Sequence, residues 1–238
     1  MLYPNDEMKI STYEETKLGY GNPKGTVWFI GPEEGGSIES WQKRISTWEN
    51  QQVLHFADLK KFHLDFREGT ERFFNTPVKL QRTWSGLIDI YFGMKGLHNA
   101  DKREFQSNEL GSLTGDTCLI ELMPFASRKL NDEEWNQNMT ESKEQYIDRL
   151  AENRMQLIAN KIKEYSPKWV VFYGKKQAQQ WHRIIELLNV SMNGTRFDEN
   201  LQIEFIASIT INFAIIPHPV SFAMNGIKQK VGQKLAEF

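Results

Sequence analysis

The sequence predicts an α/β protein, a three-layer αβα sandwich around a mostly parallel sheet of four to five strands. Short apolar runs bounded by glycine or proline recur along the chain, and amphipathic helical patterns separate them. Each run leads directly into a short polar loop. This alternation is typical of strands joined by helical crossovers. The chain has 238 residues and shows no linker or internal repeat, so we expect one domain over residues 1–238.

Four apolar runs are expected to form the core strands: residues 26–30, 117–122, 169–173 and 213–216. Each is short and apolar throughout, as a strand covered on both faces should be. Gly25 and Gly31 bound the first run, and Pro124 stops the second. Apolar residues alternate strictly over 201–213, which predicts a half-buried strand or hairpin leading into the last core strand.

Helices are expected between these strands. Residues 141–165 place Leu150, Leu157 and Ile158 on one face, and Pro167 ends the pattern. Further helices are expected after Gly174 and over 226–237. The segment from about 41 to 97 reads as a helical insertion between the first and second core strands.

Composition limits the class of protein. The formal net charge is −2, so any binding to DNA must rest on local positive charge. No apolar run is long enough to span a membrane, and the first 16 residues lack the apolar core of a signal peptide. The single cysteine, Cys118, excludes a disulfide framework, a cysteine-ligated zinc and an iron–sulfur cluster. We therefore expect a cytoplasmic protein without a membrane partner.

Polar loops follow all four core strands. In open parallel sheets, ligands bind beyond the carboxyl ends of the strands, so these loops should form the site. Together they carry acids, bases and cations: Glu33, Glu34, Glu121, Arg128, Lys129, Lys175, Lys176, His218 and Ser221. These residue types favour acid–base chemistry next to cations that can bind phosphates.

Each residue also has a purely structural reading. The glycines of GPEEGG fit a tight strand-to-helix turn, and no Gly-Lys-Ser/Thr follows to make a Walker loop. Glu33 and Glu34 fit exposed acids near a helix N-terminus. His218 lies between two prolines and fits a structural role as well as a catalytic one. Glu121 differs because it extends a buried strand, where an acid needs a partner or a purpose.

In their order, the segments WFIGPEEGG, CLIELMPFASR, VVFYG and IIPHPVS resemble the uracil-DNA glycosylase-like superfamily. The resemblance runs from residue 26 to the end of the chain. It implies that Glu33 takes the place of the water-positioning Asp or Asn. Glu121 would take the place of the Asn that reads the base edge, and His218 would hydrogen-bond the departing base.

The chain departs from the family's pattern at three points. Glu34 replaces the expected proline, and Glu121 replaces an amide. The aromatic residue that usually follows the first loop closely is absent, although Trp41, Phe125 and Phe222 are available. An ionised Glu121 only accepts hydrogen bonds, so it favours the exocyclic amine of a cytosine; a protonated one would restore the reading of uracil.

The predicted function is a DNA glycosylase that removes a flipped, modified or deaminated base, for example a modified cytosine in phage DNA, in repair or defence. Glu33 and His218 are the expected catalytic residues. Base recognition is expected from Gly31, Pro32, Glu34, Glu121 and Phe125. Contacts to single- or double-stranded DNA are expected from Arg128, Lys175, Lys176, Ser221, Phe222, Met224 and Lys228.

We expect a monomer that needs no metal or organic cofactor. Two alternatives stay open. A catalytically inactive protein of this fold would bind DNA, or another partner, without making abasic sites. A hydrolase of small nucleosides would release base from a mononucleoside.

Overall fold

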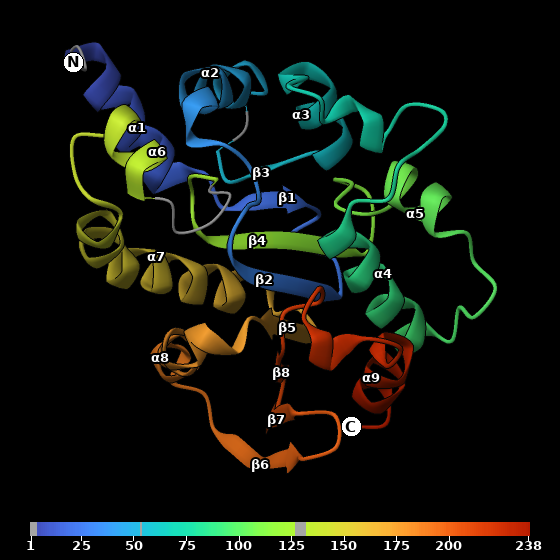
Figure 1. Ribbon diagram of the computed structural model, residues 1–238. Coiled ribbons are helices and arrows are strands. Elements are labelled where there is room, and N and C mark those ends of the chain that lie inside the picture. The colour runs from blue at the N-terminus through green and yellow to red at the C-terminus, as the bar shows by residue number, and fades with distance from the viewer. Residues whose placement is uncertain (1–3, 53, 127–131) are drawn as a thin grey trace.

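A single eight-stranded sheet runs through the molecule, in the order β3-β1-β4-β2-β5-β8-β7-β6 (Figure 1). This is a computed structural model, and it describes residues 4–52, 54–126 and 132–238. The strands are β1 (Gly19–Gly21), β2 (Val27–Glu33), β3 (Phe56–Ala57), β4 (Thr117–Met123), β5 (Trp169–Tyr173), β6 (Met192–Asp198), β7 (Ile203–Ser208) and β8 (Asn212–Ile216).

The sheet is mixed, which corrects the expectation of a mostly parallel sheet of four to five strands. The central strands β4, β2, β5 and β8 are parallel, as predicted for the four apolar runs. Outside them, β1 is antiparallel to β4, β7 to β8, and β6 to β7. Of the added strands, β7 lies within the alternating pattern from which a strand or hairpin was predicted over 201–213. The sequence gives no signal for the other three, because β1 and β3 are only three and two residues long and β6 is exposed and mostly polar.

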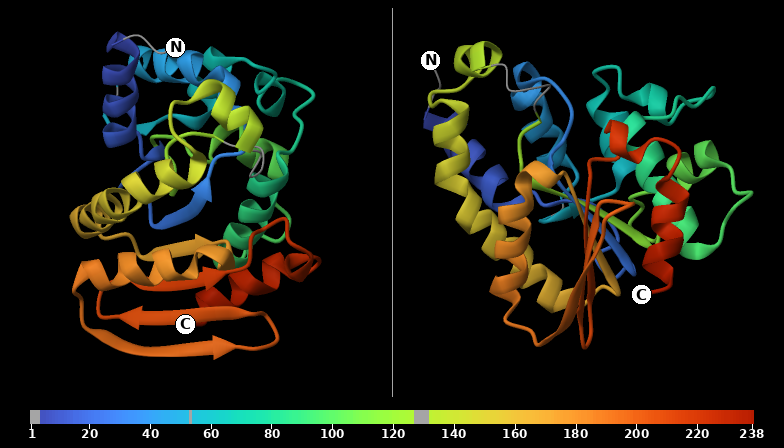
Figure 2. Two further views of the ribbon diagram at one scale, coloured as in Figure 1. Left: turned by 60° about the vertical axis from the view of Figure 1, so that its left-hand side comes forward. Right: turned by 60° about the horizontal axis from the view of Figure 1, so that its bottom comes forward.

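Helices cover both faces of the sheet. They are α1 (Pro4–Thr16), α2 (Trp41–Asn50), α3 (Leu59–Phe66), α4 (Arg82–Lys95), α5 (Lys102–Asn108), α6 (Asp132–Asn138), α7 (Lys143–Tyr165), α8 (Ala178–Leu188) and α9 (Lys228–Ala236). Figure 2 shows α7 and α8 on one face and α4 and α9 on the other. Across the described ranges, no helix is both long and apolar enough to cross a membrane.

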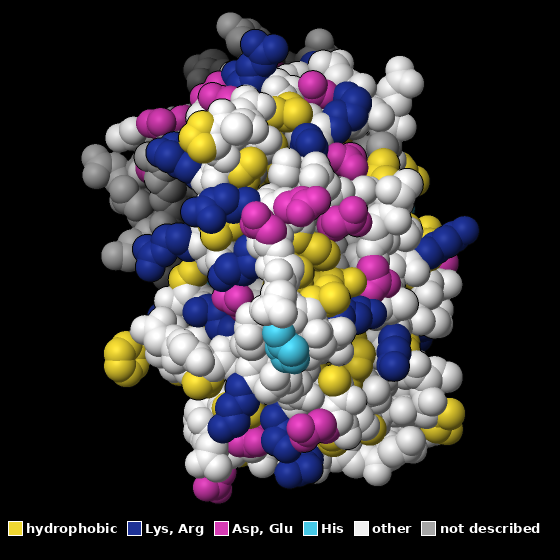
Figure 3. Space-filling model, turned by 90° about the vertical axis from the view of Figure 1, so that its right-hand side faces the viewer, with side chains coloured by type: hydrophobic (Ala, Val, Ile, Leu, Met, Phe, Trp, Pro, Cys, Tyr) yellow, Lys and Arg dark blue, Asp and Glu magenta, His cyan; other side chains and the backbone are white. Residues whose placement is uncertain are grey.

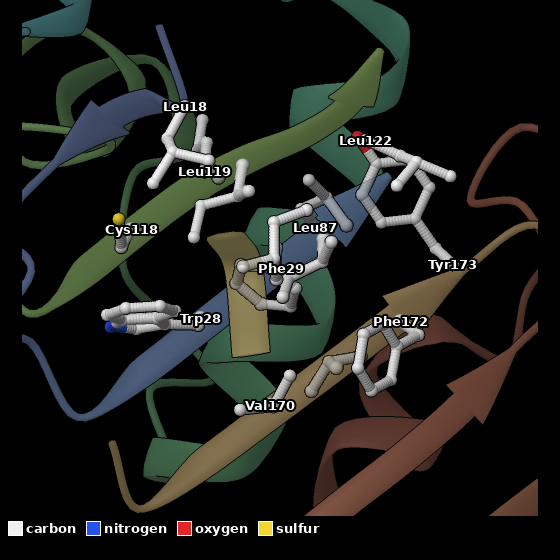
Figure 4. Packing of buried hydrophobic residues seen from close by; sticks show 14 of the residues in the cluster. Leu18, Trp28, Phe29, Leu87, Cys118, Leu119, Leu122, Val170, Phe172 and Tyr173 are labelled. Atoms are coloured by element: carbon white, nitrogen blue, oxygen red, sulfur yellow. The ribbon is translucent and has the colours of Figure 1, made fainter. Parts of the chain in front are cut away.

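The core lies between the central strands and these helices. Trp28, Phe29 and Phe172 are fully buried there, and Leu87 of α4 packs on the same cluster (Figure 4). A capping box in which the side chains of Ser142 and Gln145 bond each other's backbone N–H groups fixes the start of α7.

Helices α4 and α9 touch through their backbones. A Cβ atom on Gly93 would lie 2.1 Å from the carbonyl oxygen of Gln229, and one on Gly232 would lie 2.0 Å from that of Ile90. Only glycine permits this approach. The contact fixes α9, and with it the loop that leads from β8 into α9.

Candidate active site

The loops at the carboxyl ends of β2, β4, β5 and β8 meet at a cavity of about 270 Å³. Because these strands are parallel, their carboxyl ends share one edge of the sheet. Predicted site residues form much of its wall: Pro32, Glu33, Glu34, Glu121 and His218. The chain between β2 and β4 closes the other side with His63, Thr70, Phe73, Gln81, Thr83 and Trp84, while Tyr173 comes from β5.

Glu121 and Tyr173 form one hydrogen-bonded pair in this wall. The Tyr173 hydroxyl donates to Oε1 of Glu121 over 3.3 Å. Gly31 is the register partner of Glu121 across β2 and β4. A Cβ atom on Gly31 would lie 2.1 Å from Cζ of Tyr173, so glycine here makes room for the ring. Gly31 thus contributes to the site by admitting Tyr173.

The surroundings of Glu121 favour the neutral form of its carboxyl. Burial raises its pKa to about 8; Lys17 opposes this shift and Glu34 adds to it. Its Oε2 atom is buried and has no hydrogen-bond partner in the described part of the chain. The ionised form, on which the expected preference for a cytosine amine rested, is therefore the minor form. A proton on Oε2 makes that atom a donor toward a ligand.

Glu33 is held by a lysine that the sequence did not mark. The Lys143 ammonium lies 2.9 Å from Oε2 of Glu33 and donates to Oε1 over 3.0 Å. Lys143 is the first residue of α7 and is buried. Burial raises the pKa of Glu33, and the hydrogen bond from Lys143 acts against that shift. Glu33 is partly exposed in the cavity, so its carboxylate is open to a ligand or water.

Glu34 is buried in a charged cluster and is not an exposed acid. It accepts hydrogen bonds from Nη1 of Arg44 over 2.8 Å and from the Tyr20 hydroxyl over 3.0 Å. The Lys17 ammonium lies 3.6 Å away. Burial alone would raise the pKa of Glu34, but Arg44 and Lys17 more than offset it and hold the value at about 2. Glu34 therefore stays ionised.

His63 of α3 borders both this cluster and the cavity. Its Nε2 lies 3.5 Å from Oε1 of Glu34, and neither ring nitrogen has a hydrogen-bond partner among the described residues. The rings of Phe74 and Trp84 pack on the imidazole, with centroids 5.9 and 5.2 Å away. Burial lowers the pKa of His63 to about 4, so the ring is neutral. His63 therefore lines the cavity as a neutral ring whose two nitrogens are buried and make no hydrogen bond within the described residues.

His218 lies two residues beyond β8 and faces Tyr173, with ring centroids 5.4 Å apart. The backbone N–H of Val220 donates to Nδ1 of His218 over 3.3 Å. Burial lowers the pKa of His218, so the ring is neutral at pH 7. Since Nδ1 accepts, the ring proton lies on Nε2, and His218 is a hydrogen-bond donor at that atom.

Two aromatic side chains on the insertion side line the cavity. Phe73 is partly exposed and packs edge-on against Trp84, with centroids 5.5 Å apart. These rings supply the aromatic surface that the sequence did not locate. Phe125 does not reach the cavity, because it is buried between Tyr13 and Tyr146 with centroids 5.3 and 5.9 Å away.

The loop after His218 presents one exposed aromatic side chain. Phe222 is 90% exposed, whereas Met224 is completely buried and is not presented to a partner. The backbone N–H of Ser221 donates to the His218 carbonyl over 2.8 Å and closes the turn. The side-chain oxygen of Ser221 is buried without a partner among the described residues. The loop thus exposes Phe222 one residue after a turn that is hydrogen-bonded to His218.

The described cationic residues of the predicted site, Lys175, Lys176 and Lys228, do not line the cavity. Lys175 bonds Oε1 of Gln202 over 3.0 Å, and Lys176 is exposed. Lys228 packs over Gly86 of α4. Arg128 and Lys129 lie outside the described residues. Figure 3 shows a face on which Lys and Arg alternate with Asp and Glu, in keeping with the small net charge.

Sequence reasoning missed Lys17, Arg44, His63, Lys143 and Tyr173. Only Tyr173 carried a signal, because it is the last residue of a predicted strand. The other four come from helices or a helix end, and their periodic patterns do not single them out. In the part of the chain described, no three His, Cys, Asp or Glu side chains are grouped to hold a metal ion.

The resemblance to the uracil-DNA glycosylase-like superfamily rests on the residues of this chain, because comparison with known proteins adds no support. No protein-family model and no curated protein sequence matches the chain. The convergence of Glu33, Glu121 and His218 at one cavity is therefore the main evidence on function.

Proposed function

We propose that the protein is a DNA glycosylase that hydrolyses the N-glycosidic bond of a flipped base. One observation carries the proposal: a carboxylate, a neutral carboxyl and a histidine donor converge from three strand ends on one cavity. Its volume of about 270 Å³ lies below the roughly 300–1,000 Å³ of pockets for drug-sized ligands. A single base with its sugar at the mouth suits this size.

In the proposed reaction, the bond between the base nitrogen and C1′ breaks and its electron pair goes to the base. Nε2–H of His218 donates to the negative charge that grows on the base. Glu33 stabilises the cationic sugar and orients the attacking water. The water oxygen bonds to C1′, and one water proton ends on the base nitrogen. Lys143 favours the carboxylate form of Glu33, because its hydrogen bond and charge act against the rise in pKa that burial causes.

Glu121 and Tyr173 would read the base edge. A protonated Oε2 donates, so it favours a base with a carbonyl oxygen at this edge over one with an amine. The Tyr173 hydroxyl already donates to Oε1, and its own oxygen can accept from a base N–H. This donor–acceptor pattern matches an imide edge, as in uracil or a 5-substituted uracil.

The aromatic residues would hold the flipped nucleotide. Phe73 and Trp84 line the cavity and offer a surface for stacking, worth roughly 1–3 kcal/mol per base. The exposed Phe222 would enter the gap that the flipped base leaves in the duplex. Lys175, Lys176 and Lys228 would meet phosphates farther from the cavity.

The test is an abasic-site assay on oligonucleotides that contain uracil, hypoxanthine, 5-hydroxymethyluracil or 5-hydroxymethylcytosine. We expect alkali-sensitive breaks that fall at least about 100-fold in Glu33→Gln and His218→Ala. Glu104→Gln and His98→Ala change exposed residues of the same types and should keep the wild-type rate. Breaks that persist in both site variants would refute the assigned roles.

Two outcomes would replace the proposal. DNA bound without breaks on any base would identify a non-catalytic binding protein. Base released from free nucleosides but not from DNA would identify a nucleoside hydrolase. Neither outcome gives breaks in DNA, so a DNA-binding measurement and a base-release assay on free nucleosides distinguish the two.

A further inference from the structure

A second and larger hollow adjoins the base cavity. It is an open groove of about 660 Å³ along α2 and the segment from residue 66 to 73. The groove and the cavity share four lining residues: Gly35, Thr70, Phe73 and Gln81. The two hollows are therefore contiguous, and a ligand held in the cavity can extend into the groove.

The passage between them is open at Gly35. A Cβ atom at this position would meet no atom within 4 Å. Thr70, which also lines both hollows, is fixed because its hydroxyl donates to the carbonyl groups of His63 and Arg67 over 3.1 and 3.0 Å. Arg67 and Gly69, which precede Thr70, adopt positive φ angles of 65° and 75°. Gly35 therefore leaves one edge of the passage without a side chain, and the hydrogen bonds of Thr70 fix another part of its wall.

The groove suits an uncharged polar group better than a phosphate. Its buried cation, Arg44, bonds Glu34, and Lys43 bonds Glu68 over 2.5 Å. The remaining cation, Arg72, lies over the Phe73 ring, with its guanidinium carbon 4.9 Å from the ring centroid, and Glu39 adds a second carboxylate to the lining beside Glu68.

Hydrogen-bonding and aromatic side chains make up the rest of its lining. Ser40, Gln42, Thr70 and Gln81 offer hydroxyl and amide groups, and Phe66 and Phe73 offer rings. Hydroxyls, amides and aromatic faces are what a sugar ring requires, because its hydroxyls need donors and acceptors and its C–H face packs on rings.

We propose that the groove is a subsite for a bulky neutral polar substituent on the base, such as a hexose linked through a 5-hydroxymethyl group. This inference rests on the proposed function and narrows its substrate to hypermodified bases. The base would occupy the cavity beside Glu121, and the sugar would pass Gly35 into the groove. A base without the substituent would leave the groove empty and lose those contacts.

The test compares matched pairs of oligonucleotides: 5-hydroxymethyluracil with its glucosylated form, and 5-hydroxymethylcytosine with its glucosylated form. We expect the glucosylated member of one pair to be excised at least as fast as its partner. In Gly35→Leu, which closes the passage, the ratio of the glucosylated to the unsubstituted rate should fall at least tenfold. Gln42→Trp should lower the same ratio from inside the groove, while Asn50→Trp, at the exposed end of α2, should not.

Excision of an unsubstituted base with none of its glucosylated form would overturn the subsite and leave the glycosylase proposal standing. An equal loss on both members in Gly35→Leu and Gln42→Trp would show that the groove holds a neighbouring nucleotide instead. Fluorescence anisotropy with the same oligonucleotides covers the case of no excision at all. Tighter binding of the glucosylated member, lost in Gln42→Trp, would then support the subsite while the glycosylase proposal fails; equal binding would refute both.

Discussion

Replacing Glu121 with glutamine should make the protein more stable at neutral pH. The wild-type side chain is buried, its pKa is raised to about 8, and its Oε2 has no partner among the described residues. In the unfolded chain the same carboxyl ionises near its ordinary value of 4.5. Folding at pH 7 must therefore place a proton on a group that would otherwise be ionised. Glutamine has the same shape, accepts from Tyr173 through its own Oε1, and needs no proton.

The size of the effect follows from these two values. Between 4.5 and pH 7 lie 2.5 pH units, at about 1.4 kcal/mol each, which gives about 3 kcal/mol. The sign follows from proton binding: the folded state of the wild type binds more protons than the unfolded state between pH 4.5 and 8, so its stability falls as pH rises through this range. The Glu121→Gln variant does not lose stability in this way as the pH rises. The difference between the two proteins should be small at pH 5 and largest above pH 8.

Urea unfolding of both proteins at pH 5, 7 and 8.5 measures the difference. In a separate thermal unfolding experiment at pH 7, the melting temperature of Glu121→Gln should lie about 6–12 °C above that of the wild type. Glu199→Gln, at an exposed position, controls for a general effect of removing a carboxylate. A difference that does not change with pH, or a variant less stable than wild type at pH 8.5, would refute the neutral state of Glu121.

Three further changes test the remaining contacts. Lys143→Gln removes the cation that opposes the effect of burial on Glu33, so the pKa of Glu33 should rise further and the acid limb of the pH–rate profile for excision should move to higher pH. Glu34→Gln leaves Arg44 buried without its carboxylate and should cost about 3–5 kcal/mol in urea unfolding at pH 7, a loss that shrinks as pH falls from 4.5 toward 2. Phe222→Ala should change stability by less than about 0.5 kcal/mol, because the ring is 90% exposed, yet slow excision from duplex more than from single-stranded DNA.

The sequence predicted the centre of the fold well because buried parallel strands carry a strong local signal. Strand β5 (Trp169–Tyr173) has the predicted bounds, and β4 differs by one residue. The edge of the sheet was not predictable in the same way. β1 pairs three residues, Gly19–Gly21, with β4, and its only local signal is a tyrosine between two glycines.

The sequence predicted the site residues that directly follow a strand. It did not predict the residues that tertiary packing brings to the site from distant helices. Glu33, Glu121 and His218 meet at one cavity, as strand order requires. The partners that set their behaviour lie far away in sequence. Lys143 is 110 residues from Glu33, and this pair forms because α7 begins beside the end of β2.

Glu34 and Glu121 line the same cavity, but their surroundings shift the pKa values of their carboxyls in opposite directions. Arg44 and Lys17 hold the pKa of Glu34 near 2, whereas burial moves that of Glu121 to about 8. Environments that separate two carboxyl pKa values in this way divide anionic from proton-donating roles in active sites. The neutral state of Glu121 costs about 3 kcal/mol of folding free energy at pH 7, and among the described residues its Oε2 makes no hydrogen bond in return. A bound acceptor in the cavity would supply that hydrogen bond, so the carboxyl whose neutral state costs folding free energy is also one that can donate to a ligand.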